Sequence, residues 1–214
     1  MKFIFFLSII ILCGLNCIGE KKASEDTLAS TILLILPAFS DSANSVTSSS
    51  GAVDTTQSSG IYTTVANASS TSEWVYVSLK ESGKKATASS QWDIRFKRYV
   101  IGTNSGTSGS GSGGSCDTTK TNLLDHSINT STCPLVSDSS QSQSGEGGFG
   151  TANESASPSM IFWYSYDGIS HLLRTKNLVY LVRGNDGAIY SLQMLDYYSS
   201  AGTSGYMKFT WKRS

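Results

Sequence analysis

The stretch LVYLVRGNDGAIYSLQML, residues 178–195, decides the fold class. Its two arms, 178–183 and 189–195, are rich in β-branched, aromatic and other apolar residues, and a Gly-Asn-Asp-Gly sequence at 184–187 separates them. Asn and Gly tolerate the positive φ angles that tight hairpin turns require. The stretch therefore predicts two antiparallel strands joined by a short turn.

Strand-like segments continue on both sides of this hairpin. Residues 161–166 form an apolar and aromatic run that ends at an Asp-Gly turn. Residues 206–211 alternate, so that Met207, Phe209 and Trp211 share one face. A period of two residues is the pattern of a half-buried strand. The C-terminal part of the chain thus predicts a series of antiparallel strands, with Met207 in the core.

Two similar segments lie nearer the N-terminus. Residues 74–79 are β-branched and aromatic, and residues 92–97 alternate cleanly. This alternation predicts that Trp92, Ile94 and Phe96 point inward and that the charged residues between them point outward. No long amphipathic helical pattern follows the N-terminal segment. We therefore expect an all-β fold, an antiparallel meander or sandwich.

Long stretches of small polar residues interrupt these strands. Residues 103–115 are nearly all Gly, Ser and Thr, and residues 137–159 are similar. Loops of this length are uncommon in compact domains and often serve as lids or binding loops. The sequence therefore predicts long Gly/Ser-rich loops with a functional role.

The first sixteen residues have the features of a secretory signal. Lys2 provides a positive charge, and residues 3–12 form an apolar run shorter than the roughly 20 residues of a spanning helix. The segment before Cys17 resembles the relaxed lipobox of spirochaete lipoproteins, so we expect cleavage before Cys17 and lipidation of this residue. Cys13 is a weaker candidate because bulky Leu12 precedes it. An ordinary signal peptide with an incidental Cys17 is the alternative.

This assignment divides the chain into three parts. Residues 1–16 are the predicted lipoprotein signal peptide, residues 17–60 a lipidated flexible tether, and residues 61–214 the β domain. Residues 40–59 are almost entirely small and polar, and such a segment has too little apolar surface to order itself. Each buried methylene of an acyl chain adds about 0.8 kcal/mol of membrane affinity. We therefore expect membrane attachment through the lipid alone, and the flexible tether would let the domain stand clear of the cell surface.

The charge balance excludes one class of partner. The chain has 16 basic and 16 acidic residues, and removal of Lys2 with the signal leaves 15 basic residues. A nucleic-acid-binding domain requires a basic face. The near-neutral mature chain therefore argues against a nucleic-acid partner and against a polybasic membrane patch.

Cys116 and Cys133 are the two cysteines that remain beyond the lipidation site. An even pair in an exported chain predicts a disulfide. A zinc site is the alternative, but two thiols without clustered His or Cys partners are a poor zinc ligand set.

Signatures of catalysis are scarce. The chain has no Gly-x-Ser-x-Gly elbow, no His-Glu-x-x-His and no phosphate-binding loop with a Lys. Only two histidines exist, His126 and His171. Either can be a solvated loop residue, although imidazole and thioether groups also serve as axial haem ligands. We therefore expect a non-enzymatic protein.

Two blocks of the sequence resemble a known family. Residues 92–99 followed by residues 103–106 are similar to the W-D-I-x-F-x-R … T-N-x-G signature of HmuY-like proteins. The run of Tyr, Leu, Val, Asp-Gly and Phe residues across 180–209 is similar to the closing strands of that family. The resemblance covers roughly residues 61–213, and the two blocks occur in the same order.

The resemblance implies an all-β, hand-shaped haem-binding lipoprotein of the outer membrane that passes haem to a TonB-dependent receptor. Members with two axial ligands take them, as His or Met, from the regions after the Trp-Asp block and before the closing strands. In this chain those regions contain His126, His171 and Met160. We expect His126 and His171 to ligate the haem iron, with Met160 as the substitute for either. Three aromatic residues are then candidates for the apolar wall of the site, with core packing as the alternative: Trp163, Tyr164 and Tyr166.

Two other functions compete with haem binding. A surface adhesin that binds host matrix or plasma proteins also fits, because flexible Ser/Thr loops beside exposed Tyr and Lys suit protein contacts. An enzyme is the weakest hypothesis, because no nucleophile and base are found close together in the sequence.

Overall fold

The structure is a computed structural model that describes residues 49–142 and 153–214. All described residues belong to one compact unit. The predicted signal peptide, Cys17 and most of the predicted tether lie outside the described residues. In the part that the structure describes, no helix is long and apolar enough to cross a membrane.

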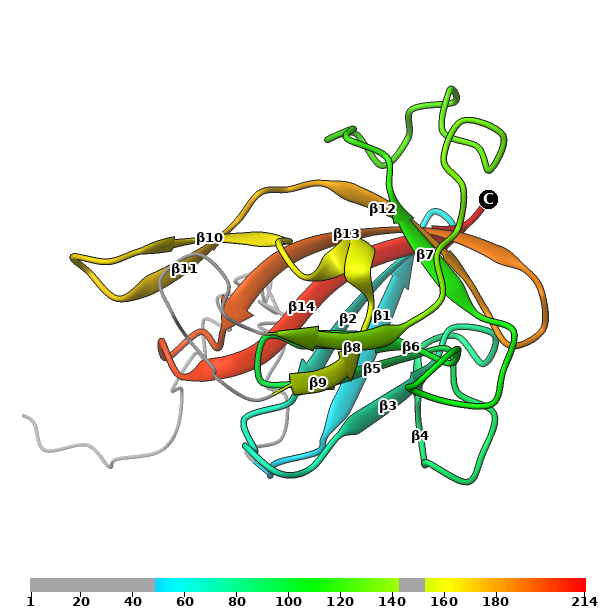
Figure 1. Cartoon of the computed structure of the whole chain (residues 1–214). Coiled ribbons are helices and arrows are strands. Elements are labelled where there is room, and N and C mark those ends of the chain that lie inside the picture. Colours follow the sequence, from blue (N-terminus) through cyan, green and yellow to red (C-terminus); the bar gives the residue numbers. More distant parts are fainter. Residues whose placement is uncertain (1–48, 143–152) are drawn as a thin grey trace, which may run out of the picture. The chain divides into compact units, whose positions relative to one another are not determined.

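The described chain is built from short antiparallel strands and one turn of 3-10 helix (Figure 1). In chain order the elements are β1 (Val53–Ser58), β2 (Ile61–Asn67), β3 (Val75–Ser78), β4 (Lys84–Ala86), β5 (Ile94–Lys97), β6 (Val100–Thr103), β7 (Gly114–Asp117), β8 (Ser139–Ser142), β9 (Asn153–Ala156), η1 (Pro158–Met160), β10 (Tyr164–Asp167), β11 (Leu172–Thr175), β12 (Val179–Arg183), β13 (Ile189–Tyr198) and β14 (Ser204–Arg213).

Two main sheets enclose the core. One has six strands in the order β1-β2-β14-β13-β12-β7, and the other has four in the order β4-β3-β5-β6. Two separate hairpins, β8-β9 and β10-β11, complete the strand set. All strand pairs are antiparallel. The predicted all-β antiparallel class is therefore confirmed.

The 178–195 stretch forms the hairpin that its sequence predicts. Strand β12 pairs with β13 from Val179↔Gln193 to Arg183↔Ile189. Gly187 has φ +80° in the turn between them, a conformation that glycine adopts without steric cost. Strand β13 then pairs with β14, which in turn pairs with β2. The hairpin thus supplies two interior strands of the six-stranded sheet.

Aromatic and aliphatic side chains fill the space between the two main sheets. Met207, Phe209 and Trp211 on β14 are 0–1% exposed, as their alternation predicts. The ring of Phe209 contacts Phe96 of the opposite sheet, with centroids 5.1 Å apart, and Trp211 stacks on Tyr62 at 4.2 Å. This interleaved packing buries apolar surface, and such burial is the main source of stability.

The domain begins earlier in the chain than predicted. Strand β1, residues 53–58, lies within the predicted tether yet pairs along its whole length with β2. Its side chains alternate between partly buried and exposed and include few apolar groups. An edge strand of this kind is held by backbone pairing, so its sequence carries little hydrophobic signal. The boundary at residue 60 was therefore wrong.

The stretches rich in Gly and Ser are more ordered than predicted. Residues 103–113 fold against the domain, with Ser105 buried and the Gly113 N–H bonded to the Asn104 carbonyl at 2.9 Å. The stretch 137–159 contributes β8, β9 and η1 among its described residues. Small side chains allow close backbone approach, so these segments pack where bulkier sequences would not fit.

Candidate functional site

The Trp-Asp signature joins three parts of the fold. The Asp93 carboxylate is 2% exposed, and one oxygen accepts hydrogen bonds from the backbone N–H groups of Leu79 (2.6 Å) and Lys80 (3.1 Å). The other oxygen accepts the N–H of Asn185 at 2.6 Å. One buried carboxylate thus holds the turn after β3 against the turn between β12 and β13. This finding corrects the prediction that Asp93 points outward.

Arg95 is also buried, at 8% exposed, although it was predicted to point outward. Its guanidinium carbon lies 3.9 Å from the centroid of the Trp74 ring and 5.5 Å from that of Trp92. Such contacts over aromatic faces favour a cation. Gly102 pairs with Arg95 across β5 and β6, and a Cβ there would lie 3.0 Å from the Arg95 Nε atom. The glycine therefore leaves room for the buried cation.

The Thr-Asn-Ser-Gly block is held by a second buried carboxylate. Asp138, 3% exposed, accepts the Thr103 N–H at 2.8 Å and the hydroxyl protons of Thr103 (2.5 Å) and Ser108 (2.6 Å). Burial raises the pKa of Asp138, while these hydrogen bonds and the charge of Arg95 oppose that rise. Both family-like blocks are therefore structural supports rather than ligand sites.

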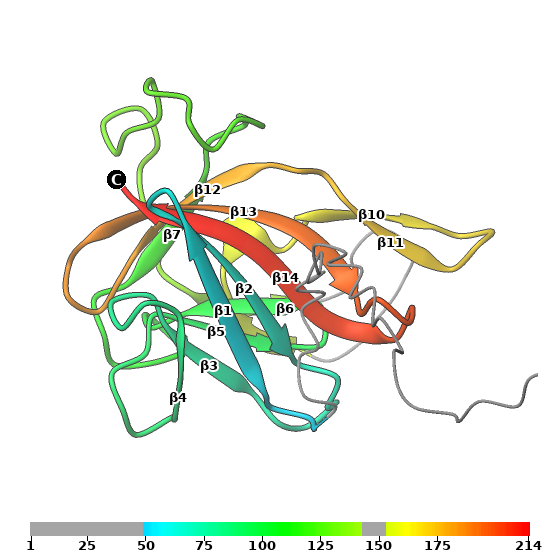
Figure 2. The same ribbon diagram turned by 180° about the vertical axis from the view of Figure 1, so that it is seen from behind.

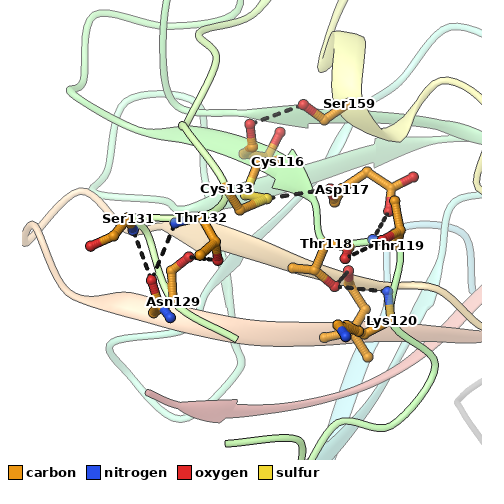
Figure 3. Close-up of a disulfide and its surroundings, with 12 residues drawn as sticks. Cys116, Asp117, Thr118, Thr119, Lys120, Asn129, Ser131, Thr132, Cys133 and Ser159 are labelled. Atoms are coloured by element: carbon orange, nitrogen blue, oxygen red, sulfur yellow. Dashed lines mark hydrogen bonds between the residues drawn. A yellow bond between two sulfur atoms is a disulfide. The ribbon is translucent and has the colours of Figure 1, made fainter. Parts of the chain in front are cut away.

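The predicted disulfide between Cys116 and Cys133 is present, with the two Cα atoms 5.9 Å apart (Figure 3). It closes the loop that carries His126, and both cysteines are buried. A cavity of about 220 Å³ opens beside the disulfide. Its lining is mostly hydroxyl, amide and charged groups: Asp117, Thr118, Thr119, Lys120, Ser127, Ile128, Asn129, Thr132 and Cys133. A cavity lined in this way offers little apolar surface to a porphyrin face.

His171 lies at the tip of a different element, the β10-β11 hairpin. It is exposed and has φ +57°, a left-handed conformation that His adopts more readily than most residues. The Tyr166 hydroxyl lies 2.5 Å from the Nδ1 atom of His171. On either side of the histidine, Ile169 is 93% exposed and Leu172 is 39% exposed. The tip therefore combines an imidazole with exposed apolar surface.

The turn of this hairpin is braced locally. The Asp167 carboxylate accepts the N–H groups of Ile169 (2.9 Å) and Ser170 (3.3 Å) and the Ser170 hydroxyl proton at 2.7 Å. The Ser170 hydroxyl is the main cause of a lowered pKa for Asp167, followed by the two backbone bonds. Further along, the Leu173 N–H donates to the Tyr198 hydroxyl at 2.9 Å and ties the hairpin to β13.

Met160 is unavailable as a haem ligand in this conformation. It is 1% exposed, at the end of η1, and belongs to the hydrophobic core. Trp163 and Tyr164 are likewise 1% exposed core residues, and the Trp163 indole N–H donates to the Tyr99 carbonyl at 2.8 Å. Of the three aromatic residues considered for a haem wall, only Tyr166 is partly exposed.

The structure does not bring the predicted ligands together. The loop between β7 and β8, which carries His126, and the β10-β11 hairpin, which carries His171, extend from different ends of the domain (Figure 1 and Figure 2). Large exposed apolar side chains occur at both: Leu124 and Val136 in the loop, and Ile169 and Leu172 at the hairpin. Among the described residues, no group of three or more His, Cys, Asp or Glu forms a metal site. Within the described part of the chain, the predicted ligands His126 and His171 therefore lie on separate elements.

The pairing of Tyr166 with His171 was not predicted. The sequence signal was the Asp-Gly turn that separates them, because a hairpin over residues 164–175 brings the end of β10 close to the turn residue that precedes β11. From the sequence alone, the two residues have separate predicted roles, Tyr166 as part of the apolar wall of a haem site and His171 as a ligand to the iron.

Comparison with known proteins identifies the family. The profile of the HmuY protein family matches residues 70–211. This match spans most of the chain, and the chain therefore belongs to the HmuY family. No curated protein sequence matches it.

Solved structures share the fold. A candidate lipoprotein of Bacteroides fragilis is 20% identical, with 74% of this chain and 92% of that one covered and a TM-score of 0.56. A candidate HmuY-like haem-binding protein of Bacteroides vulgatus is 16% identical, with 74% and 94% covered and a TM-score of 0.58. The apo form of an HmuY analogue of Tannerella forsythia is 14% identical, with 76% and 96% covered and a TM-score of 0.56.

Proposed function

We propose that this protein binds haem at the β10-β11 hairpin, with His171 as an axial ligand to the iron. The observation that carries the proposal is the exposed imidazole of His171 between two exposed apolar residues, on a fold of the HmuY family. The bound haem would supply an iron for the imidazole and apolar faces for Ile169 and Leu172. The chain's part is to sequester the haem, without catalysis.

The environment of each histidine favours His171 over His126. The Nδ1 atom of His171 lies within hydrogen-bonding distance of the Tyr166 hydroxyl, whereas His126 is not among the residues that line the cavity beside the disulfide. A metal-ligating His usually bonds through its second ring nitrogen to a protein group, which fixes the ring orientation. We therefore assign the ligand to His171 and use His126 as the control.

A haemin titration of the full chain in detergent tests this assignment. We expect a saturable 1:1 shift of the Soret band in the wild type and in His126→Ala. Loss of an outer-shell partner alone weakens metal binding by about 10- to 100-fold, so His171→Ala, which removes the ligand itself, should weaken it at least that much. Absence of a Soret shift in the wild type would overturn haem binding. Equal weakening in both variants would overturn the choice of His171.

We also propose that lipid on Cys17 anchors the protein to the outer membrane and that it delivers haem to a TonB-dependent receptor. The short apolar run before Cys17 supports the anchor. Metabolic labelling with a fatty acid should mark the wild type and Cys13→Ala but not Cys17→Ala. Labelling of Cys17→Ala would contradict the anchor. Failure of the wild type to transfer haem to membranes bearing such a receptor would contradict delivery.

A further inference from the structure

The contact between Tyr166 and His171 restricts which nitrogen of the imidazole can bind a metal. Tyr166 is on β10 and His171 directly precedes β11, so the hairpin itself brings them together. Their oxygen and Nδ1 atoms are 2.5 Å apart, and their rings are tilted by 39°. Tyr166 also packs against the hydrophobic core, whereas His171 is exposed. The tyrosine is thus a partly buried anchor for an exposed imidazole.

A neutral imidazole carries one ring proton, so the direction of this hydrogen bond matters. If the Tyr166 hydroxyl donated to Nδ1, the proton of His171 would be on Nε2 and would block that atom as a ligand. If Nδ1–H donates to the Tyr166 oxygen, the Nε2 lone pair is free. The second direction leaves the outward nitrogen able to bind iron.

We infer that Tyr166 is a positioning residue that accepts the Nδ1 proton of His171 and thereby presents Nε2 to the haem iron. The inference rests on the proposed haem function and names the group that tunes its ligand. Ile169 and Leu172, which flank His171 in the sequence and are exposed, are the apolar side chains that would contact the porphyrin. Removing the Tyr166 hydroxyl would leave the His171 imidazole free to rotate and to exchange between its two tautomers, while the iron ligand itself would stay in place.

The tautomer can be measured without haem. In the full chain labelled with ¹⁵N-histidine, long-range ¹H–¹⁵N correlations above the pKa range of histidine distinguish a protonated Nδ1 from a protonated Nε2. We expect the Nδ1–H tautomer for His171 in the wild type and in a control, Tyr76→Phe, which alters a tyrosine on the four-stranded sheet. We expect Tyr166→Phe to shift the population toward Nε2–H. A wild-type His171 protonated on Nε2 would overturn the inference.

Haemin titration of the same proteins supplies the second readout. We expect Tyr166→Phe to bind haemin about 10- to 100-fold more weakly than the wild type and Tyr76→Phe to bind equally well. Wild-type binding with unchanged affinity in Tyr166→Phe would overturn this inference alone, whereas no wild-type binding would overturn the proposed function with it. If Tyr166→Phe abolished binding while His171→Ala retained it, Tyr166 would be the ligand and its positioning role would be wrong.

Discussion

Replacing Asp93 with alanine should remove a large part of the stability of the domain. The carboxylate accepts three backbone N–H groups, from Leu79, Lys80 and Asn185. A buried donor left without a partner costs about 1–3 kcal/mol, and a hydrogen bond to a charged group contributes about 1.5–3 kcal/mol. Water can reach the partly buried Lys80 and Asn185 donors, so these two should cost about 1 kcal/mol each. With the buried Leu79 donor, the expected loss is about 3–5 kcal/mol.

Guanidinium denaturation of the full chain, followed by tryptophan fluorescence, measures this loss. Typical domains are stable by about 5–15 kcal/mol, so Asp93→Ala should lower the midpoint strongly or prevent folding. Asp54→Ala is the control because Asp54 is exposed on β1, where a substitution should change stability by less than about 0.5 kcal/mol. A loss below about 1 kcal/mol in Asp93→Ala would refute the view that this carboxylate joins the two turns.

Three further predictions concern the loops. Gly106 has φ +51°, and a Cβ there would overlap the Asp138 carbonyl oxygen, so Gly106→Ala should lower the free energy of unfolding by at least about 2 kcal/mol in the same denaturation assay. Gly168 has open space around it, so Gly168→Ala should be near neutral. Equal losses of stability in the two variants would contradict the clash at Gly106. Reducing the disulfide, which spans 17 residues, should lower the free energy of unfolding by about 3 kcal/mol; thiol alkylation before reduction would show that it is absent. Because burial raises the pKa of Asp138, the folded state holds a proton on this carboxyl more tightly than the unfolded state does. The stability of the wild type relative to Asp138→Asn should therefore be highest at acid pH and fall as the pH rises through the folded-state pKa of Asp138, and a rise would contradict this sign.

The sequence predicted the strands best where burial and alternation coincide. Strand β14 buries every second residue, and β12 and β13 meet at a turn with its own conformational signal, so both were found. Strand β1 was missed because its residues are mostly exposed and polar, and its backbone pairing with β2 leaves no trace in composition. Pattern therefore predicts the centre of this sheet better than its edge.

Charged residues near β5 were placed wrongly for a related reason. Alternation assumes that every second residue of a strand faces water, but Asp93 precedes β5 and points to two turns. Arg95 is within β5, yet two tryptophans and a glycine accommodate it in the interior. These partners come from different parts of the chain, so a local pattern cannot anticipate them.

The candidate site was predicted only in part for the same physical reason. The chemistry of imidazole and thioether groups singles out His126, His171 and Met160, but solvent access and proximity depend on tertiary structure. Folding buries Met160 and places the two histidines on separate elements. The disulfide was predictable because only two cysteines remain beyond the lipidation site.

The position of the hairpin separates the proposed ligand residue from the scaffold of the domain. Strands β10 and β11 form a sheet of their own, outside the two sheets that Asp93 and Asp138 help to hold. Residues 168–171 at the tip are all exposed, so substitutions there remove little buried surface. The residues of the family signature therefore support the scaffold, whereas the proposed ligand His171 lies outside it. His171→Ala should consequently weaken haem binding while leaving the denaturation midpoint almost unchanged.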